Sequence, residues 1–229
     1  MNGALGCLSS QQISTTTYKD QAYQVIKEAI LYRRLKVGEI YSQDNICNQL
    51  NISRTPVREA LLELSKEGYV SFLRGKGIMV TPIESKEATD IVELRKILEI
   101  AGCRLAAERA TQEQMDEIKK HLCSMEYGIT QNDGPEELYK VDRRFHRSIF
   151  LAAGNTWLLD TVEKCRDHYL RVESQTAFNT REMCQEVLKE HYEIYHAICA
   201  RNEDEAVRAM TIHLDRTCER TLYLSENKR

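Results

Sequence analysis

One stretch decides the fold of the N-terminal part of this chain: Ser53-Arg54-Thr55-Pro56-Val57-Arg58-Glu59-Ala60-Leu61-Leu62-Glu63-Leu64. Thr55 is a favourable N-cap, and Pro56 suits the first helical position because its missing N–H costs nothing there. A helix is therefore predicted to start here. Its apolar residues recur with the spacing of a single buried helix face: Val57, Ala60, Leu61 and Leu64.

The other edge of the predicted helix is basic and rich in hydroxyl groups. It carries Ser53, Arg54, Thr55 and Arg58. Because a helix N-terminus has partial positive charge and free N–H groups, such a first turn suits phosphates and base edges. The same pattern also fits any amphipathic helix with solvated arginines, so the neighbouring segments have to decide.

Those segments favour a winged helix-turn-helix. Upstream, Ser42 is placed to cap a short helix, and Asn51 suits a left-handed residue at its end. Downstream, Gly68 ends the basic helix, and two short apolar runs, 69–73 and 78–81, flank a tight basic turn. Helix, turn and basic helix followed by two strands predict a DNA-binding domain with a two-stranded wing.

These residues resemble the GntR family of transcription factors over about 18–82. The resemblance rests on the stretch quoted above, on Leu64, on Glu67-Gly68 and on a glycine-containing wing. It implies that the start of the basic helix contacts double-stranded DNA and that the wing tip reaches toward the minor groove. The implied wing-tip residues are Arg74, Gly75, Lys76 and Gly77. One position departs from some members, which have a base-reading arginine where this chain has Asp44.

Length and composition fit two domains without disulfide bonds. The chain has 229 residues and eight cysteines, none in a C-x-x-C pair, which favours small buried thiols in a reducing cytoplasm. Residues 1–17 have no charged side chain and are expected to form a flexible arm rather than a signal peptide. No apolar stretch is long enough for a membrane span, so we expect a cytoplasmic protein.

The net charge of −3 hides an asymmetry between the two parts of the chain. Residues 18–82 hold ten Lys or Arg and seven Asp or Glu, which gives +3, so the other residues carry −6. A basic part on an acidic body is compatible with DNA binding, although ordinary charge scatter also gives a difference this small.

The rest of the chain predicts helices. The first, 18–34, has a buried stripe of Ala22, Val25, Ile26, Ala29 and Ile30. Six more are expected in 83–229, the first of them capped by Ser85 and running to Ala110. Its expected stripe is Ile91, Leu94, Leu98, Ala101 and Leu105. The fold class is therefore mainly α, a winged helix-turn-helix followed by an antiparallel bundle of six to seven helices.

Three of the bundle helices place polar residues among their apolar stripes. Asp142 and His146 lie one turn apart on one helix, while His191 and His213 fall in register on two later helices. Burying an unpaired carboxylate is costly unless it is paired or binds a metal. The set predicts either a divalent metal site, with zinc first and nickel, manganese or iron as alternatives, or a hydrogen-bonded core network.

The bundle is similar to the FCD effector-binding domain of the FadR branch of the GntR family, over about 85–224. The resemblance implies that the Asp-x-x-x-His pair and the two later histidines bind metal. It also implies that Arg95 faces a ligand pocket, where a guanidinium would suit a small organic acid. An alternative for Arg95 is a surface pair with Glu99, four residues on.

The sequence therefore indicates a homodimeric transcription regulator, a repressor by expectation, on a palindromic operator. A metabolite bound in the bundle would modulate its affinity for DNA. Three alternatives stay open: a metal-dependent hydrolase, a regulator for which the ion itself is the signal, and polar groups that serve stability only. No catalytic motif accompanies the histidines, so an enzyme is not expected.

Overall fold

The computed structural model describes residues 16–173, 178 and 180–226, and the chain divides between Pro82 and Ile83 into two compact units. Most of the arm expected at 1–17 lies outside the described residues. Each unit is described by itself below.

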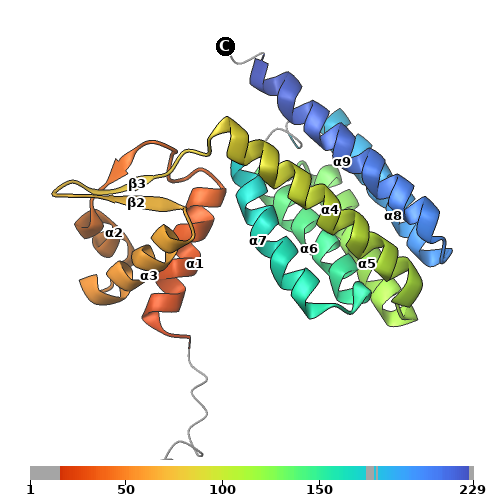
Figure 1. Cartoon of the computed structure of the whole chain (residues 1–229), viewed down its shortest axis with the longest axis horizontal. Helices are drawn as coiled ribbons and strands as arrows, with labels where there is room; N and C mark the ends of the chain where they lie inside the picture. Colours follow the sequence, from red (N-terminus) through yellow and green to blue (C-terminus); the bar gives the residue numbers. More distant parts are fainter. Residues whose placement is uncertain (1–15, 174–177, 179, 227–229) are drawn as a thin grey trace, which may run out of the picture. The chain divides into compact units, whose positions relative to one another are not determined.

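The first unit is a helix-turn-helix with a small antiparallel sheet (Figure 1). Its elements are α1 (Tyr18–Leu31), β1 (Ile40–Tyr41), α2 (Gln43–Leu50), α3 (Arg54–Lys66), β2 (Val70–Leu73) and β3 (Gly77–Val80). The strand order is β1-β3-β2, so the wing expected with two strands has a third. A two-residue strand such as β1 is too short to produce an alternating pattern, and pairing with β3 defines it.

A glycine makes this third strand possible. Gly77 has φ +120°, and a Cβ there would lie 2.2 Å from the carbonyl oxygen of Tyr41. The backbones of β1 and β3 therefore approach each other where only glycine fits.

The basic helix α3 starts earlier than expected. Ser53, rather than Thr55, is its N-cap residue, and Pro56 is the third helical residue. Proline is tolerated there because the first-turn N–H groups have no partner within the helix. Ser42 occupies the N-cap position of α2 without a capping hydrogen bond from its side chain, and Asn51 is left-handed as expected.

The helices of this unit meet through their apolar stripes. The four apolar residues expected to be buried in α3 have no exposed surface, and α3 packs on α1. In α1 the expectation for Val25 is wrong, because its side chain is 47 % exposed. Val25 is rotated by about 100° from Ile26 around the helix, which places it outside the face that α3 covers.

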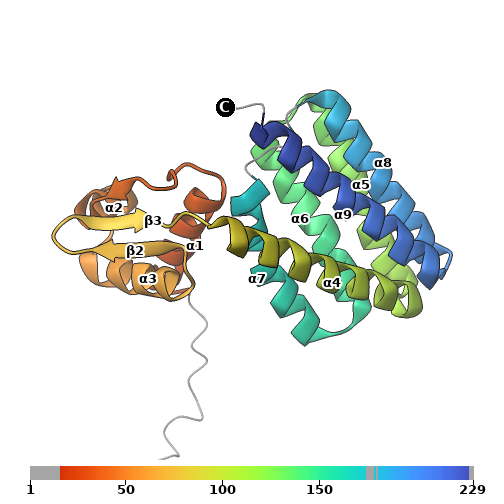
Figure 2. The same cartoon turned by 45° about the horizontal axis from the view of Figure 1, so that its top comes forward.

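The described residues of the second unit form six helices packed as a bundle, as expected; Figures 1 and 2 show their arrangement. Its helices are α4 (Ser85–Arg109), α5 (Gln112–Gln131), α6 (Pro135–Ala153), α7 (Thr156–Glu173), α8 (Arg181–Cys199) and α9 (Glu203–Glu226). Helix α4 contacts α6, α7, α8 and α9, and α5 contacts α6 and α8. Among the residues that the structure describes, no helix has the length and apolar character to cross a membrane.

The buried face of α4 differs from the predicted one. Its N-cap residue is Glu84, and Leu94 is 44 % exposed. The residues that face the interior are Arg95, Glu99, Gly102, Cys103, Ala106 and Ala107. A Cβ at Gly102 would lie 2.3 Å from the ring of Phe150, so this glycine lets α4 approach α6 closely. The buried face of α4 is therefore rotated around the helix axis from the face that apolar periodicity alone predicts.

Candidate metal centre and nucleic-acid interface

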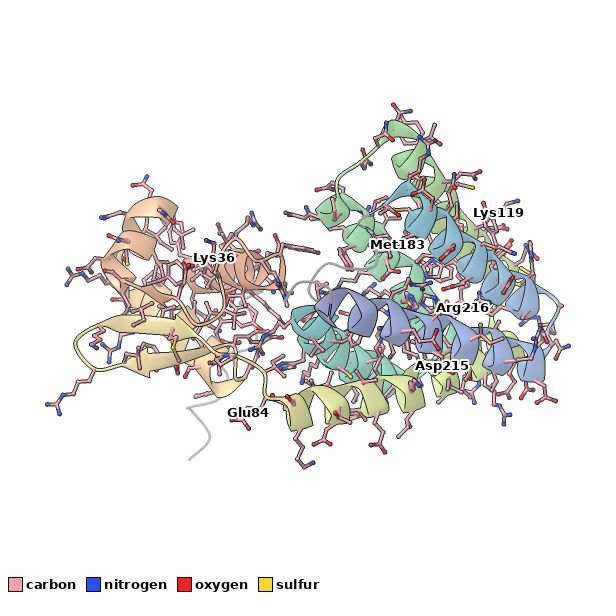
Figure 3. The ribbon with its side chains drawn as sticks, turned by 90° about the horizontal axis from the view of Figure 1, so that it is seen from above. Lys36, Glu84, Lys119, Met183, Asp215 and Arg216 are labelled. Carbon is pink, nitrogen blue, oxygen red and sulfur yellow. The ribbon has the colours of Figure 1, made fainter. Side chains whose placement is uncertain are left out.

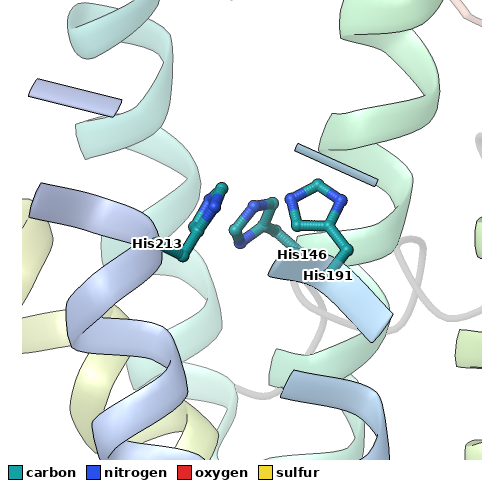
Figure 4. A group of neighbouring side chains, drawn as sticks. All are labelled: His146, His191 and His213. Atoms are coloured by element: carbon teal, nitrogen blue, oxygen red, sulfur yellow. The ribbon is translucent and has the colours of Figure 1, made fainter. Parts of the chain in front are cut away.

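Three histidines from three helices meet in the interior of the bundle. His146 of α6, His191 of α8 and His213 of α9 are all buried, and their ring centroids are 4.7 to 5.3 Å apart. One nitrogen from each ring lies within 4.8 Å of those of the other two. Figure 4 shows the three rings turned toward a shared space. The structure thus brings together the three histidines that the helical register predicted.

Asp142 completes the predicted set of four. Its Oδ1 lies 3.6 Å from His146 Nε2 and 3.4 Å from His191 Nε2. Its Oδ2 accepts a hydrogen bond of 2.7 Å from Nη2 of Arg166, a residue of α7. One carboxylate oxygen therefore faces the histidines while the other is held by an arginine.

A carboxylate stands behind two of the three rings. His146 Nδ1 lies 2.6 Å from Glu99 Oε2, and His213 Nδ1 lies 2.9 Å from Glu190 Oε2. His213 is hydrogen-bonded to its carboxylate at Nδ1 and so presents Nε2 to the space between the rings, whereas the contact of His146 Nδ1 with Glu99 is close but lacks hydrogen-bond geometry. The Nε2 atoms of all three histidines are buried and, among the described residues, have no hydrogen-bond partner. Such convergent unsatisfied nitrogens fit the demands of a metal ion.

The environment keeps two of the rings neutral. Burial, assisted by the charge of Arg166, lowers the pKa of His146 to about 4. Burial, assisted by His213, lowers the pKa of His191 well below its ordinary value. Since a metal binds the unprotonated imidazole, these rings are in the ligand form at neutral pH.

Arginines keep the two backing carboxylates ionised. Burial acts to raise the pKa of Glu99, but the charges of Arg166 and Arg95 outweigh it and hold that pKa well below its usual range. Burial likewise opposes ionisation of Glu190, yet its bonds to His213 and Arg220 lower the pKa to about 2. Paired charges therefore flank the centre, while the ring of Phe145 stacks on His191 with the ring centroids 4.2 Å apart.

Two α9 arginines and one α7 arginine hold these carboxylates. Arg220 donates to both oxygens of Glu190 at 2.9 Å, and Arg216, labelled in Figure 3, lies 3.4 Å from one of them. Arg166 donates to Glu99 at 2.5 Å as well as to Asp142. The sequence analysis did not identify Glu190, Arg166 or Arg220 as members of the centre. The signal for Glu190 was its place directly before His191, at the edge of a buried stripe.

Arg95 lies inside the bundle, so the alternative of a surface pair with Glu99 is wrong in its location. Its side chain is 5 % exposed, its Nε donates to Glu99 Oε1 at 2.8 Å, and its guanidinium lies 4.0 Å from the ring centroid of Tyr169. It borders a narrow hollow beside the histidines, with a free volume of about 10 Å³. The lining residues are Arg95, Tyr139, Asp142, Phe178, Val187, His213 and Thr217.

The remaining histidines and several cysteines lie outside this centre. His121 is 3.5 Å from Glu117, and His168 is 3.1 Å from Arg171. His196 lies near the rings of Tyr192 and Tyr195. Four cysteines are buried, as small apolar side chains are expected to be: Cys47, Cys103, Cys165 and Cys184.

In the first unit, the predicted DNA-contacting residues other than Ser53 and Thr55 border one hollow. Ser53, Arg54, Thr55 and Arg58 are exposed at the start of α3, and Arg74, Gly75 and Lys76 are exposed between β2 and β3. The hollow between these two groups is lined by Ser42, Gln43, Asp44, Arg54, Arg58, Phe72, Leu73, Arg74, Gly75, Lys76 and Gly77. The start of α3 and the wing tip thus both contribute cationic side chains, those of Arg54, Arg58, Arg74 and Lys76, to the same hollow.

Comparison with protein families agrees with both units. Residues 18–80 match the model of bacterial regulatory proteins of the gntR family, and residues 90–216 match the FCD domain. This chain belongs to the GntR family. It is a DNA-binding transcription regulator with an FCD effector domain, and the relatives it matches are regulators rather than enzymes.

Relatives align with the GntR-family chain along most of its length. The Nta operon transcriptional regulator of Aminobacter aminovorans is 29 % identical, covering 82 % of this chain and 86 % of the relative. The HTH-type transcriptional repressor RspR of Escherichia coli (strain K12) is 25 % identical, covering 93 % and 92 %. The structure of E. coli McbR/YncC matches with a TM-score of 0.81 at 20 % identity, covering 92 % of this chain and all (100 %) of that one. This last likeness concerns the fold.

Proposed function

We propose that this GntR-family chain is a repressor whose affinity for its operator is set by a small organic acid bound at a metal ion in the FCD domain. The observation that carries the proposal is the convergence of three buried, unsatisfied imidazole nitrogens beside one carboxylate oxygen. The repressor role is supported by the description of RspR as a repressor.

The proposed metal ligands are Asp142, His146, His191 and His213. Three neutral nitrogens and one carboxylate oxygen suit zinc first, and nickel, manganese or iron as alternatives. The bound ion would supply a positive charge able to attract an acid. The carboxylates of Glu99 and Glu190 would hold two of the rings in the orientation that binding requires.

Arg95 is the proposed second anchor for the acid. It borders the hollow next to Asp142 and His213, where a guanidinium can pair with a carboxylate. The hollow has a free volume of about 10 Å³, room for roughly one water molecule and far below the roughly 300 Å³ at which drug-sized ligand sites begin. We therefore expect the lining side chains to rearrange when an acid binds.

DNA would be bound by two copies of the chain on a palindrome. The proposed contacts to the operator come from Ser53, Arg54, Thr55 and Arg58, and from the wing-tip residues 74–77. A second copy would cover the outer face of α4, where Leu94 is 44 % and Ile97 is 59 % exposed. Burial of exposed apolar side chains stabilises homodimers, and a two-fold dimer would place one DNA-binding unit on each half of a palindrome. We propose that this dimeric repressor acts in the cytoplasm.

The decisive experiment combines metal analysis with DNA binding. We expect freshly purified protein to contain about one metal ion per chain and His146→Ala to lose it. Carboxylic acids that bind are first found by thermal shift. We expect such an acid to change the affinity of the protein for a duplex selected from a random pool, measured by mobility shift, and a chelator to abolish that change.

Other outcomes point elsewhere. A response to metal without any acid would make the ion itself the signal. If chelation lowers the melting temperature but leaves the acid response intact, the polar groups serve stability only. For the DNA surface, Arg58→Ala should weaken binding to the selected duplex while the bundle stays folded by circular dichroism; unchanged affinity would remove Arg58 from the contacts.

A further inference from the structure

A two-point ion pair occupies the DNA-facing side of the helix-turn-helix. Arg54 Nε lies 2.9 Å from Asp44 Oδ1, and Arg54 Nη2 donates to Asp44 Oδ2 at 3.0 Å. Asp44 belongs to the first turn of α2, and Arg54 is the first residue of α3. Both side chains are exposed and border the hollow shared with Arg58 and the wing tip.

The pair leaves half of the guanidinium available. A guanidinium has two edges that can make paired hydrogen bonds, one formed by Nε and Nη2 and the other by Nη1 and Nη2. Asp44 uses the first of these edges, because its two oxygens contact Nε and Nη2 of Arg54. The second edge matches the two acceptors, O6 and N7, that a guanine shows in the major groove.

The carboxylate changes what Arg54 can do in two ways. It fixes the plane of a long side chain, whose rotamer freedom is otherwise lost when it is ordered on DNA. It also places a negative charge beside the arginine, which opposes contacts with phosphate and so reduces the part of DNA binding that ignores sequence. Both effects favour a base contact over a backbone contact.

We propose that Asp44 is a specificity-determining residue that orients Arg54 to read a guanine in the operator. Asp44 acts through Arg54 and makes no base contact of its own. The inference rests on the proposed contact of Arg54 with the operator and is independent of the proposed metal and acid.

The pair offers a clean double-mutant design. The variants are Asp44→Ala, Arg54→Ala and the double substitution. Glu28→Ala is the matched control, since Glu28 lies 3.8 Å from Arg34 in an exposed pair on the same unit, outside the hollow. The probe is a pool of duplexes with a randomised core, from which each full-length protein selects its sites.

We expect the wild-type protein to select a shared guanine that Arg54→Ala no longer requires. Asp44→Ala should reduce the preference for that guanine by about tenfold, on the scale of one bidentate base contact. It should also raise affinity for the unselected pool a few-fold, since a charge that repels phosphate is lost. In the Arg54→Ala background, removal of Asp44 should leave base preference unchanged, and Glu28→Ala should select the wild-type motif.

Three results would overturn the proposal. If Asp44→Ala keeps the guanine preference within twofold while it binds all duplexes more tightly, Asp44 only weakens phosphate contacts and does not orient Arg54. A loss of preference that is equal with and without Arg54 would show that Asp44 acts by another route. If the guanine preference persists in Arg54→Ala, Arg54 is not the residue that contacts the guanine. Circular dichroism of each variant separates these results from unfolding.

Discussion

Replacing Glu190 with glutamine gives the sharpest test of how the centre is organised. Glu190 is 2 % exposed, and its Oε2 lies 2.9 Å from Nδ1 of His213, one of the proposed ligands. Glu190→Gln keeps the size of the side chain but removes the charge that holds the ring with Nε2 toward the other histidines. A partner of this kind is worth about 10- to 100-fold in metal affinity, or roughly 1.4 to 2.7 kcal/mol.

The assay is a zinc titration of metal-free protein in competition with a chromophoric chelator. Glu186→Gln is the matched control, because Glu186 lies one turn away on α8 but is 68 % exposed and 4.0 Å from Arg220. We expect a 10- to 100-fold loss for Glu190→Gln and less than a twofold change for the control. Equal affinity for both variants, at unchanged circular dichroism, would refute the role given to Glu190.

Three further predictions concern pH, the wing and the dimer. Folding lowers the pKa of His146 from 6.5 to about 4, so the unfolded chain binds more protons than the folded chain between these pH values. In urea unfolding of metal-free protein, the free energy of unfolding should therefore fall by up to about 3 kcal/mol as the pH drops from 6.5 to 4. A flat profile would contradict a neutral buried ring. Gly77→Ala should destabilise the wing by about 3 kcal/mol and weaken DNA binding. At Gly75 a Cβ would meet nothing within 4 Å, so Gly75→Ala should cost only about 1 kcal/mol. Similar melting curves for the two variants would argue against the close approach of β1 and β3. Ile97→Asp should shift the protein toward monomers in sedimentation, whereas Tyr127→Asp, at an exposed residue of α5, should not. If the Ile97→Asp variant remains a dimer, the interface lies elsewhere.

The sequence alone determined the elements whose residues repeat with a helical period. The four buried residues of α3 and the registers of His146, His191 and His213 follow from spacing within single helices. Local capping signals likewise located the starts of two bundle helices, since Thr111 with Gln114 caps α5 and Asn155 caps α7 through their side chains, whereas α4 is capped at Glu84 and not at the predicted Ser85. These features depend on interactions between residues three or four apart, which a linear sequence contains directly.

Only the tertiary structure decided which face of α4 is inside and what surrounds the histidines. Apolar periodicity selected the face with Leu94, but Arg95 and Glu99 face inward because they pair with each other and because Arg166 of α7 also donates to Glu99. The two-residue strand β1 similarly exists through its pairing with β3. Charge compensation and strand pairing join residues tens of positions apart, so their energies are invisible to any window of sequence and appear once the helices pack.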